Sequence, residues 1–494
     1  MLTPHHPSAT AIATDGPTIA YVGDDDGAVR AGGYDEVVDL DGVLVAPAFV
    51  DAHVHLTATG LAYEGLDLSG CRSRTEVLAA VSRRVAEQPD GPIIGHGWDE
   101  RGWPDPRVPH RHELDRIAGA RAVYLARVDL HAAAISTTLL DAAPKAVDRQ
   151  GFAESGHLTA AAHDAVRTIA YGMLTADQRR TAQRIVRRRA AEHGIALVHE
   201  LAGPELSSAD DLLTALRLSN TEPGPEVVGY WGEVGGVDRA RELGALGAAG
   251  DIFVDGTIGS HTACLRRVYA DLDTRGSGYL TAAQIRDHVV ACARAGLQAG
   301  FHAIGDAAVD AVIAGFEEAA ARVGADVIRA GRHRIEHLEM TDPPLVARVA
   351  ALGVWASVQP AFDAFWGGTD GMYAQRLGWP RAETMNPFGA LAALGVPLVF
   401  GSDTPVTPID PWGTIVAAVH HHNPEYRIGT RAAFAAHTVA GWQAAGRDGV
   451  GELIPGAPAH FALWQVDGEG LPELAPGDPL PTCRGTVRAG TRIF

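Results

Sequence analysis

The stretch VLVAPAFVDAHVH, from Val43 to His55, joins an apolar run to two histidines that lie two residues apart. Side chains on a β-strand alternate between its two faces, so His53 and His55 point the same way if this run is a strand. Two imidazoles on one face at this spacing can hold one metal ion. Such a pair can also be two ordinary core or surface histidines, so the rest of the chain decides between the two interpretations.

Seven more apolar runs follow along the chain, and each ends in polar residues. Most of them precede a stretch rich in Ala, Leu and Arg that is typical of a helix. The runs occupy residues 194–201, 226–233, 251–256, 297–306, 333–339, 353–360 and 397–403. Eight buried strands that alternate with helices predict an α/β fold, the (β/α)8 TIM barrel, in which chemistry gathers at the carboxyl ends of the strands.

The regions outside this pattern predict two additions to the barrel. Residues 1–46 contain short β-like runs between turns, and residues 441–494 return to β-like character. Together they predict a small β-sandwich domain built from both termini, beside a barrel domain at 47–440. A long insertion after the first barrel strand, 61–175, is expected to form a lid or cap over the barrel mouth.

Composition excludes several classes of function. The 494 residues carry a formal net charge of −19, with 20% charged and 46% hydrophobic residues, which predicts an ordered globular chain. An acidic chain is a poor match for nucleic acid or an anionic membrane, so we expect a small-molecule substrate. The four cysteines lie far apart, which predicts neither a disulfide framework nor a structural zinc site and fits a reduced cytoplasm. Neither a signal peptide nor a membrane span is predicted, and a homodimer is left open.

Three further candidate ligands lie at the ends of other predicted strands: His302 in GFHAIGD, His337 in RIEHLE and Asp403 in VFGSDTP. Each of them alone has an ordinary structural explanation. Together with His53 and His55 they form the kind of set that holds a divalent ion and leaves a position open for water. Zn²⁺ is the expected ion, with Fe²⁺ or Mn²⁺ as alternatives.

Several long motifs occur in a fixed order along nearly the whole chain. They are PAFVDAHVHL, GHGWDE, RVDLHAA, VDGTIGSHTACL, HAIGDAAVDAV, HRIEHLEM, GSDTPVTPIDPW and GELIPGAPAHFAL. On these motifs the chain resembles the amidohydrolase superfamily, most closely the YtcJ-like amidohydrolases, a group that includes an N-substituted formamide deformylase. The resemblance implies a metal-dependent barrel with a β-sandwich made from both termini, and hydrolysis of a carbon–nitrogen bond other than a peptide bond.

The residues themselves permit such a mechanism. An ion on His53, His55 and His302, with Asp403 near it, would lower the pKa of a bound water and polarise a substrate carbonyl. Asp403 is expected to take the proton of that water and pass it to the leaving nitrogen. His337 is expected either to hold a second ion or to hydrogen-bond the attacking water or the developing oxyanion.

Four more residues are candidates for substrate binding: Trp98 and Asp99 in GHGWDE, His131 in LARVDLHAA, and His261 in GSHTA. Trp98 can equally be a core side chain, and the segment with His131 can equally be a surface edge strand. His261 stands where the family often has arginine. The run His420–His422 is expected to lie in a loop and not to hold an ion, because consecutive side chains point in different directions on a regular backbone.

Asp251 marks the largest departure from the family. Relatives of the two-metal type usually carry a lysine at this position, and its carbamylated form bridges the two ions. An aspartate is several bonds shorter, so we expect it to lie outside the ligand set and to hydrogen-bond a ligand histidine or an arginine. This predicts one ion per chain. The alternative is that Asp251 moves in and holds a second, weaker ion together with His337.

Three functions stay open at this point. The first is a hydrolase of an amide, N-formyl or cyclic amide bond. The second is a heterocycle deaminase, because attack on an amidine carbon differs only in the leaving group. The third is a catalytically weak binding protein that keeps the fold. The presence of His53, His55 and Asp403 disfavours this last function.

Overall fold

Eight parallel strands form the centre of the computed structural model, which describes residues 1–3, 6, 8–468 and 470–494. They are β4 (Phe49–Val54), β10 (Ile195–Ala202), β11 (Glu226–Trp231), β12 (Gly247–Ala248), β13 (Gln298–Ala303), β14 (Arg334–His337), β15 (Trp355–Val358) and β16 (Leu398–Phe400). Each pairs with the next in chain order, and a bridge from Val54 to Thr404, just beyond β16, joins the last strand to the first. The predicted barrel is confirmed.

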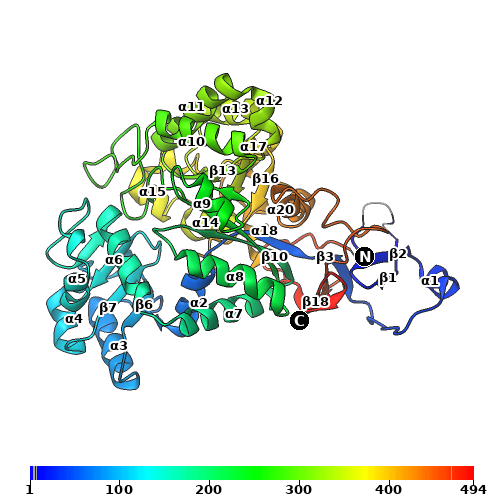
Figure 1. Ribbon diagram of the computed structural model, residues 1–494, viewed down its shortest axis with the longest axis horizontal. Coiled ribbons are helices and arrows are strands. Elements are labelled where there is room, and N and C mark those ends of the chain that lie inside the picture. Colours follow the sequence, from blue (N-terminus) through cyan, green and yellow to red (C-terminus); the bar gives the residue numbers. More distant parts are fainter. Residues whose placement is uncertain (4–5, 7, 469) are drawn as a thin grey trace.

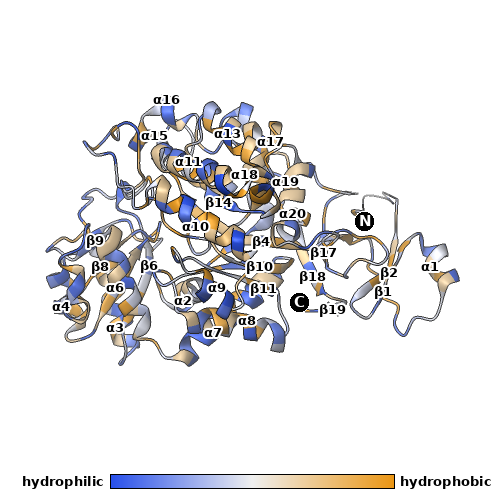
Figure 2. Cartoon of the chain, turned by 45° about the horizontal axis from the view of Figure 1, so that its top comes forward, coloured by the Kyte–Doolittle hydropathy of each residue, from blue (hydrophilic) through white to orange (hydrophobic). Residues whose placement is uncertain are grey.

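Helices surround this barrel, most of them on its outside (Figure 1). They are α7 (Ala176–Glu192), α8 (Ala209–Thr221), α9 (Val237–Glu242), α10 (Ala282–Ala295), α11 (Asp306–Val323), α12 (Ala325–Ala330), α13 (Pro343–Leu352), α14 (Pro360–Trp366), α15 (Met372–Leu377), α16 (Trp379–Ala382), α17 (Phe388–Ala393), α18 (Pro411–Val419), η3 (Pro424–Tyr426), α19 (Thr430–Ala436) and α20 (Val439–Ala444). Capping boxes at Thr175, Ser208 and Thr281 start three of them. Hydrophilic and hydrophobic residues share the same helices, such as α10, which is expected of helices with one face on a core (Figure 2).

The fourth barrel strand differs from the prediction. The strand is Gly247–Ala248, and residues 251–256 form no strand apart from one bridge between Phe253 and His302. Gly250 has a φ of +95°, a left-handed conformation that ends the extended backbone before Asp251. Asp251 therefore lies in the loop at the carboxyl end of β12, on the side where a barrel holds its active site.

Strands from both ends of the chain share one antiparallel sheet, β19-β18-β17-β3. Its strands are β3 (Leu44–Pro47), β17 (Phe461–Gln465), β18 (Thr482–Arg488) and β19 (Thr491–Arg492). A hairpin of β1 (Ala11–Asp15) and β2 (Thr18–Gly23) precedes α1 (Asp25–Ala31), and a bridge from Thr18 to Pro458 joins it to the carboxyl-terminal segment. These strands lie on the opposite side of the barrel from the insertion (Figure 1).

The insertion has a five-stranded sheet of its own, in the order β5-β6-β7-β8-β9. Its elements are α2 (Leu56–Glu64), β5 (Leu66–Asp67), α3 (Arg74–Glu87), β6 (Ile93–Trp98), η1 (Glu100–Gly102), α4 (Arg111–Ala118), β7 (Val123–Arg127), β8 (Ala132–Ile135), α5 (Thr137–Ala142), η2 (Pro144–Ala146), β9 (His157–Thr159) and α6 (Ala160–Gly172). Two separate apolar clusters pack within this unit, one including Trp98 and the other including Tyr124. The insertion therefore has its own cores beside the barrel.

Two buried histidines outside the barrel mouth make the fold sensitive to acid. His437 donates from Nδ1 to the carbonyl oxygen of Val50 at 2.7 Å, and the backbone N–H of Ala299 donates to Nδ1 of His333 at 2.9 Å. Burial lowers the pKa of each histidine to about 4. In the unfolded chain their pKa is about 6.5, so the unfolded state binds more protons between these values. Their contribution is therefore complete above pH about 6.5 and is lost as pH falls towards 4.

We accordingly expect the Tm to fall as pH is lowered from about 6.5 to 4, measured by circular dichroism melts. His437→Gln is the matched variant, because its amide can still donate to Val50 but cannot be protonated in this range. This variant should show a shallower fall in Tm over the same range. A slope identical to that of the wild type would contradict the role of His437.

Candidate metal centre

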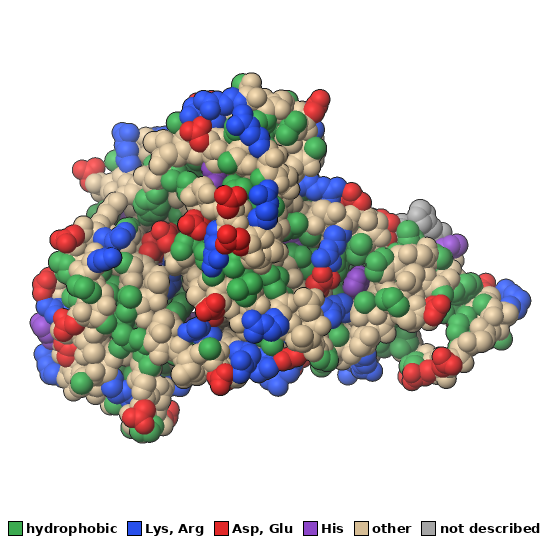
Figure 3. Space-filling view, viewed as in Figure 1, with side chains coloured by type: hydrophobic (Ala, Val, Ile, Leu, Met, Phe, Trp, Pro, Cys, Tyr) green, Lys and Arg blue, Asp and Glu red, His purple; other side chains and the backbone are tan. Residues whose placement is uncertain are grey.

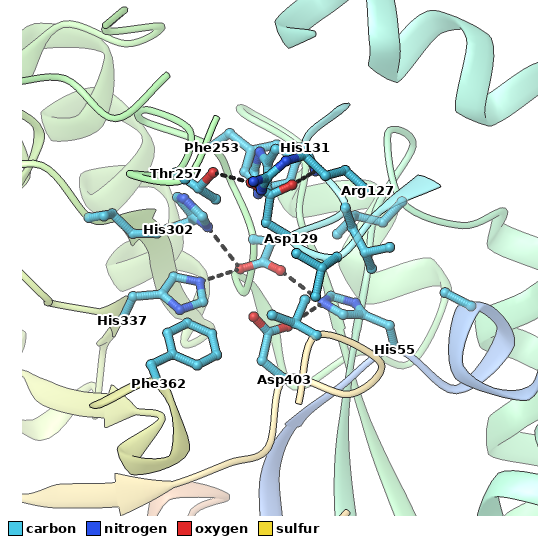
Figure 4. A pocket seen from close by; sticks show the side chains of 18 of the residues that line it. His55, Arg127, Asp129, His131, Phe253, Thr257, His302, His337, Phe362 and Asp403 are labelled. Atoms are coloured by element: carbon cyan, nitrogen blue, oxygen red, sulfur yellow. Dashed lines mark hydrogen bonds and ion pairs between the residues drawn. The ribbon is translucent and has the colours of Figure 1, made fainter. Parts of the chain in front are cut away.

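The candidate ligands gather at the carboxyl ends of the barrel strands, and all of them are buried. They are His53 and His55 at the end of β4, Asp251 after β12, His302 in β13, His337 at the end of β14 and Asp403 after β16. Figure 4 shows His302 and His337 across the site from His55, with Asp403 below. Barrel closure is what brings these distant parts of the chain together, because parallel strands present their carboxyl ends on one face.

Four of these side chains form a first group. The Nε2 atom of His53 lies 3.2 Å from Asp251 Oδ2 and 3.2 Å from Asp403 Oδ1. The Nε2 atom of His55 lies 3.1 Å from each of the same two oxygens. Two imidazole nitrogens and two carboxylate oxygens thus surround one point, which is a donor set that zinc and similar ions accept.

The remaining two histidines form a second group around the other oxygen of Asp251. Asp251 Oδ1 lies 3.7 Å from His302 Nδ1 and 3.6 Å from His337 Nε2. His302 therefore faces His337, not His53 and His55 as the sequence led us to expect. The sequence analysis expected Asp251 outside the ligand set, but the turn at Gly250 carries its carboxylate between the two groups, where it could contribute a ligand to each.

The outward nitrogen of each of the four histidines is held by an oxygen of the protein. His53 Nδ1 contacts Glu336 Oε2 at 3.0 Å, His55 Nδ1 the carbonyl of Leu201 at 3.1 Å, His302 Nε2 the carbonyl of Gly256 at 3.2 Å, and His337 Nδ1 Gln359 Oε1 at 2.8 Å. An oxygen acceptor takes an N–H from that nitrogen, so a neutral ring at each of these positions would present its lone pair on the nitrogen that faces Asp251. This arrangement is typical of metal-binding histidines.

Glu336 is a functional residue that the sequence analysis missed. The Glu336 carboxylate is fully buried between His53 and Arg334. The guanidinium of Arg334 donates to both oxygens of this carboxylate. Burial raises the pKa of Glu336, but Arg334 and His53 outweigh that effect and lower it to about 2. Glu336 is therefore ionised and fixes the ring of His53. The signal in the sequence was an Arg-x-Glu pair inside an apolar strand, where unneeded charges are rare.

The electrostatics of the site favour a cation. Burial lowers the pKa of His53, but Asp251 and Asp403 outweigh it and raise that pKa well above its ordinary value. The same two carboxylates raise the pKa of His55 to about 9, again against burial. Burial raises the pKa values of Asp251 and Asp403, and the histidines bring both far below the ordinary value. A divalent ion on neutral histidines would supply the same positive charge, so these residues fit a metal centre.

A cavity opens over the two groups. Its walls include the aromatic side chains of Tyr171, Phe253, Phe362, Trp366 and Tyr373, together with Arg101, Arg127 and Arg167. The arginines are already paired: Arg127, for example, contacts Asp99, Glu100 and Asp129. The cavity therefore combines aromatic and apolar walls with arginines that already have acidic partners and with the candidate metal ligands.

Of the four predicted substrate-binding residues, only His131 lines this cavity. Its ring centroid lies 5.4 Å from that of His302, and burial lowers its pKa to about 3, so the ring is neutral. Trp98 is instead a core side chain of the insertion whose Nε1 donates to the Leu125 carbonyl at 2.8 Å.

Asp99 and His261 also lie outside the lining of the cavity. Asp99 pairs with Arg101 and Arg127, which both line the cavity, and so acts on the cavity through these two arginines. His261 Nε2 contacts Asp271 at 3.0 Å in an outer loop. The expectation that Trp98, Asp99 and His261 contact substrate is thus corrected, because each is already engaged by other side chains or by the core.

Comparison with known proteins places this geometry in a family. The profile of the amidohydrolase family matches residues 36–494. The chain belongs to the amidohydrolase family. It is 27% identical to YtcJ of Bacillus subtilis (strain 168) over 78% of this chain and 74% of that protein, and 24% identical to the N-substituted formamide deformylase of Arthrobacter pascens over 82% and 78%.

Among solved structures, the amidohydrolase is similar to an uncharacterized metal-dependent hydrolase from Pyrococcus furiosus, with a TM-score of 0.70 and 29% identity over 92% of this chain and 95% of that one. The protein is therefore a metal-dependent hydrolase with a buried His and Asp cluster suited to a divalent ion. None of the described helices is long and apolar enough to cross a membrane. On the face seen in Figure 3, acidic and basic side chains are interspersed.

Proposed function

We propose that this amidohydrolase cleaves a carbon–nitrogen bond other than a peptide bond, in an amide, an N-formyl amine or a cyclic amide, with two divalent ions. The ions would be held by His53, His55, Asp403 and Asp251 in one group and by Asp251, His302 and His337 in the other. The observation that carries the proposal is the position of Asp251, whose two oxygens face the two groups. Zn²⁺ is the first candidate, with Mn²⁺ and Fe²⁺ next, because imidazole and carboxylate ligands suit all three.

When bound, such ions supply Lewis-acid chemistry that lowers the pKa of water and polarises a carbonyl. Asp403 supplies the proton transfer. Its carboxylate is ionised, because the histidines beside it lower its pKa, and it lies at the floor of the cavity where it can accept a proton. The same group can then give that proton to the leaving nitrogen.

His131 is positioned to act on the substrate carbonyl. Its ring is neutral and contacts the ring of Phe253, with centroids 5.3 Å apart, and its backbone N–H donates to Asp129 at 3.2 Å. A neutral imidazole can donate one hydrogen bond to a carbonyl oxygen or to the negative charge that develops there. Because His131 belongs to the insertion, the insertion would contribute a residue to the active site.

The walls of the cavity favour a substrate with an aromatic or bulky apolar group. Burying such a group contributes about 1.5–3 kcal/mol, or roughly a factor of ten to one hundred in kcat/KM. The N-substituted formamide deformylase among the relatives makes N-formyl amines a natural first class to assay. The membership in a family of hydrolases argues against a protein that only binds, and deamination of a heterocycle becomes an outcome of the assay.

The test removes the metal and then varies the substrate. Activity should fall below about one-hundredth after dialysis against a chelator and return with added Zn²⁺ or Mn²⁺. N-formyl and N-acyl 2-phenylethylamine should be cleaved with kcat/KM about tenfold or more above their ethylamine counterparts, with carboxylate and no ammonia released. Ammonia release from amino-heterocycles, with no cleavage of any amide, would overturn the proposal. Fractionation checks the expected cytoplasmic location, and light scattering decides whether the protein forms the homodimer that the sequence leaves open.

A further inference from the structure

A second cluster of ligand atoms lies outside the active site, between α14 and the loop that follows α18. Asp363 of α14 is 4% exposed and faces His421 and His422 of the loop. The Oδ1 atom of Asp363 lies 3.2 Å from His421 Nε2 and also contacts His422 Nδ1. The three ligand atoms lie within 4.8 Å of one another. Two consecutive histidines can converge here because residues 420–422 belong to neither a helix nor a strand.

Direct hydrogen bonding explains only part of this contact. His421 Nε2 is 3.2 Å from Asp363 Oδ1 but makes no hydrogen bond, because the two atoms are not aligned for one. On a tetrahedral ion with bonds of ~2.0 Å, two ligand atoms lie about 3.3 Å apart. The separation between His421 Nε2 and Asp363 Oδ1 is close to this value, as are the separations within the first group of the active site, whereas His422 Nδ1 is in direct hydrogen-bond contact with Asp363 Oδ1.

The outward nitrogen of His421 fits a ligand role. His421 Nδ1 lies 3.3 Å from the carbonyl oxygen of Asn423, so an N–H at that atom can donate to the backbone and leave the Nε2 lone pair facing Asp363. The opposite tautomer is the alternative, in which Nδ1 accepts from the backbone N–H of Asn423 at 3.0 Å. That tautomer places the proton between His421 and Asp363.

Charge also favours a cation at this position. Burial lowers the pKa of His421 to about 4, so its ring is neutral at pH 7. In the described part of the chain no arginine or lysine pairs with Asp363; its ion-pair contacts are the two histidines. The backbone N–H of His422 donates to Asp363 Oδ2 at 3.0 Å but brings no net charge, and a buried carboxylate without a cation is costly, so a metal ion would balance it.

We propose that Asp363, His421 and His422 form a separate binding site for a divalent transition-metal ion, with Zn²⁺ as the probe of choice. Two imidazoles and one carboxylate leave a fourth position for water. The site lies behind the wall of the substrate cavity: Phe362, next to Asp363, stacks on the ring of His337, and Trp366 at the end of α14 lines the cavity. An ion here would fix α14, and with it that wall.

The test compares zinc content among matched variants of the full chain after equilibrium dialysis. Asp363→Asn keeps an oxygen that accepts hydrogen bonds but removes the charge, and His422→Ala removes a ligand. His420→Ala is the control, because His420 Nε2 donates instead to the Leu474 carbonyl at 2.6 Å. Wild type and His420→Ala should hold one equivalent of zinc more per chain than Asp363→Asn and His422→Ala, with circular dichroism unchanged.

Equal zinc content in all four proteins would overturn the proposal and leave the cluster as a direct hydrogen bond between His422 and Asp363. Crystals soaked in zinc give an independent readout that needs no variant. An anomalous peak between the three side chains is expected, and its absence while the active site is occupied would also overturn the proposal.

Discussion

Asp403→Asn is expected to lower turnover by about two to four orders of magnitude while the protein stays folded and keeps metal. An asparagine still offers an oxygen to an ion, but it cannot accept a proton from water or return one to the leaving nitrogen. The loss should therefore appear in kcat, with KM little changed. Steady-state kinetics together with metal analysis of the purified variant measure both effects.

Asp410→Asn is the matched control for this experiment. Asp410 lies in the same loop and caps α18, where its Oδ1 accepts from the backbone N–H of Gly413 at 3.0 Å, outside the lining of the cavity. This variant should keep wild-type turnover. Wild-type turnover in Asp403→Asn would remove Asp403 from the mechanism.

Asp251→Asn is expected to be at least as damaging, with activity reduced by about three orders of magnitude or more, because a neutral amide cannot join two cations. The Asp251 carboxylate is what His53 and His55 share with His302 and His337. Asp251→Glu keeps the charge and should recover part of the activity and most of the metal.

Because no lysine has to be carbamylated, added or removed bicarbonate should leave wild-type activity unchanged.

Much of this site could be predicted from polar residues at the ends of predicted strands. The barrel brings five of them together at the carboxyl ends of its strands: His53, His55, His302, His337 and Asp403. The alternation of apolar runs with helical stretches is a strong signal, and the fold then dictates that the carboxyl ends of the strands meet.

The parts that escaped prediction depend on local backbone or on distant pairing. The sequence of residues 251–256 resembles that of a strand. The left-handed backbone at Gly250 is what directs the Asp251 side chain into the candidate metal centre. Glu336 and His53 are 283 residues apart in sequence, so their contact exists only after the barrel closes. Asp363 contacts two adjacent histidines because the loop that carries them is irregular. An irregular loop has no sequence periodicity from which such a contact could be predicted.

Zinc content per chain shows whether Asp251 joins two metal positions. The measurement uses Asp363→Asn, in which the second cluster contributes no ion, with and without the additional Asp251→Asn change. After loading with zinc and dialysis, we expect two equivalents of zinc in Asp363→Asn and fewer than one in the double variant. One equivalent in Asp363→Asn that persists in the double variant would contradict it.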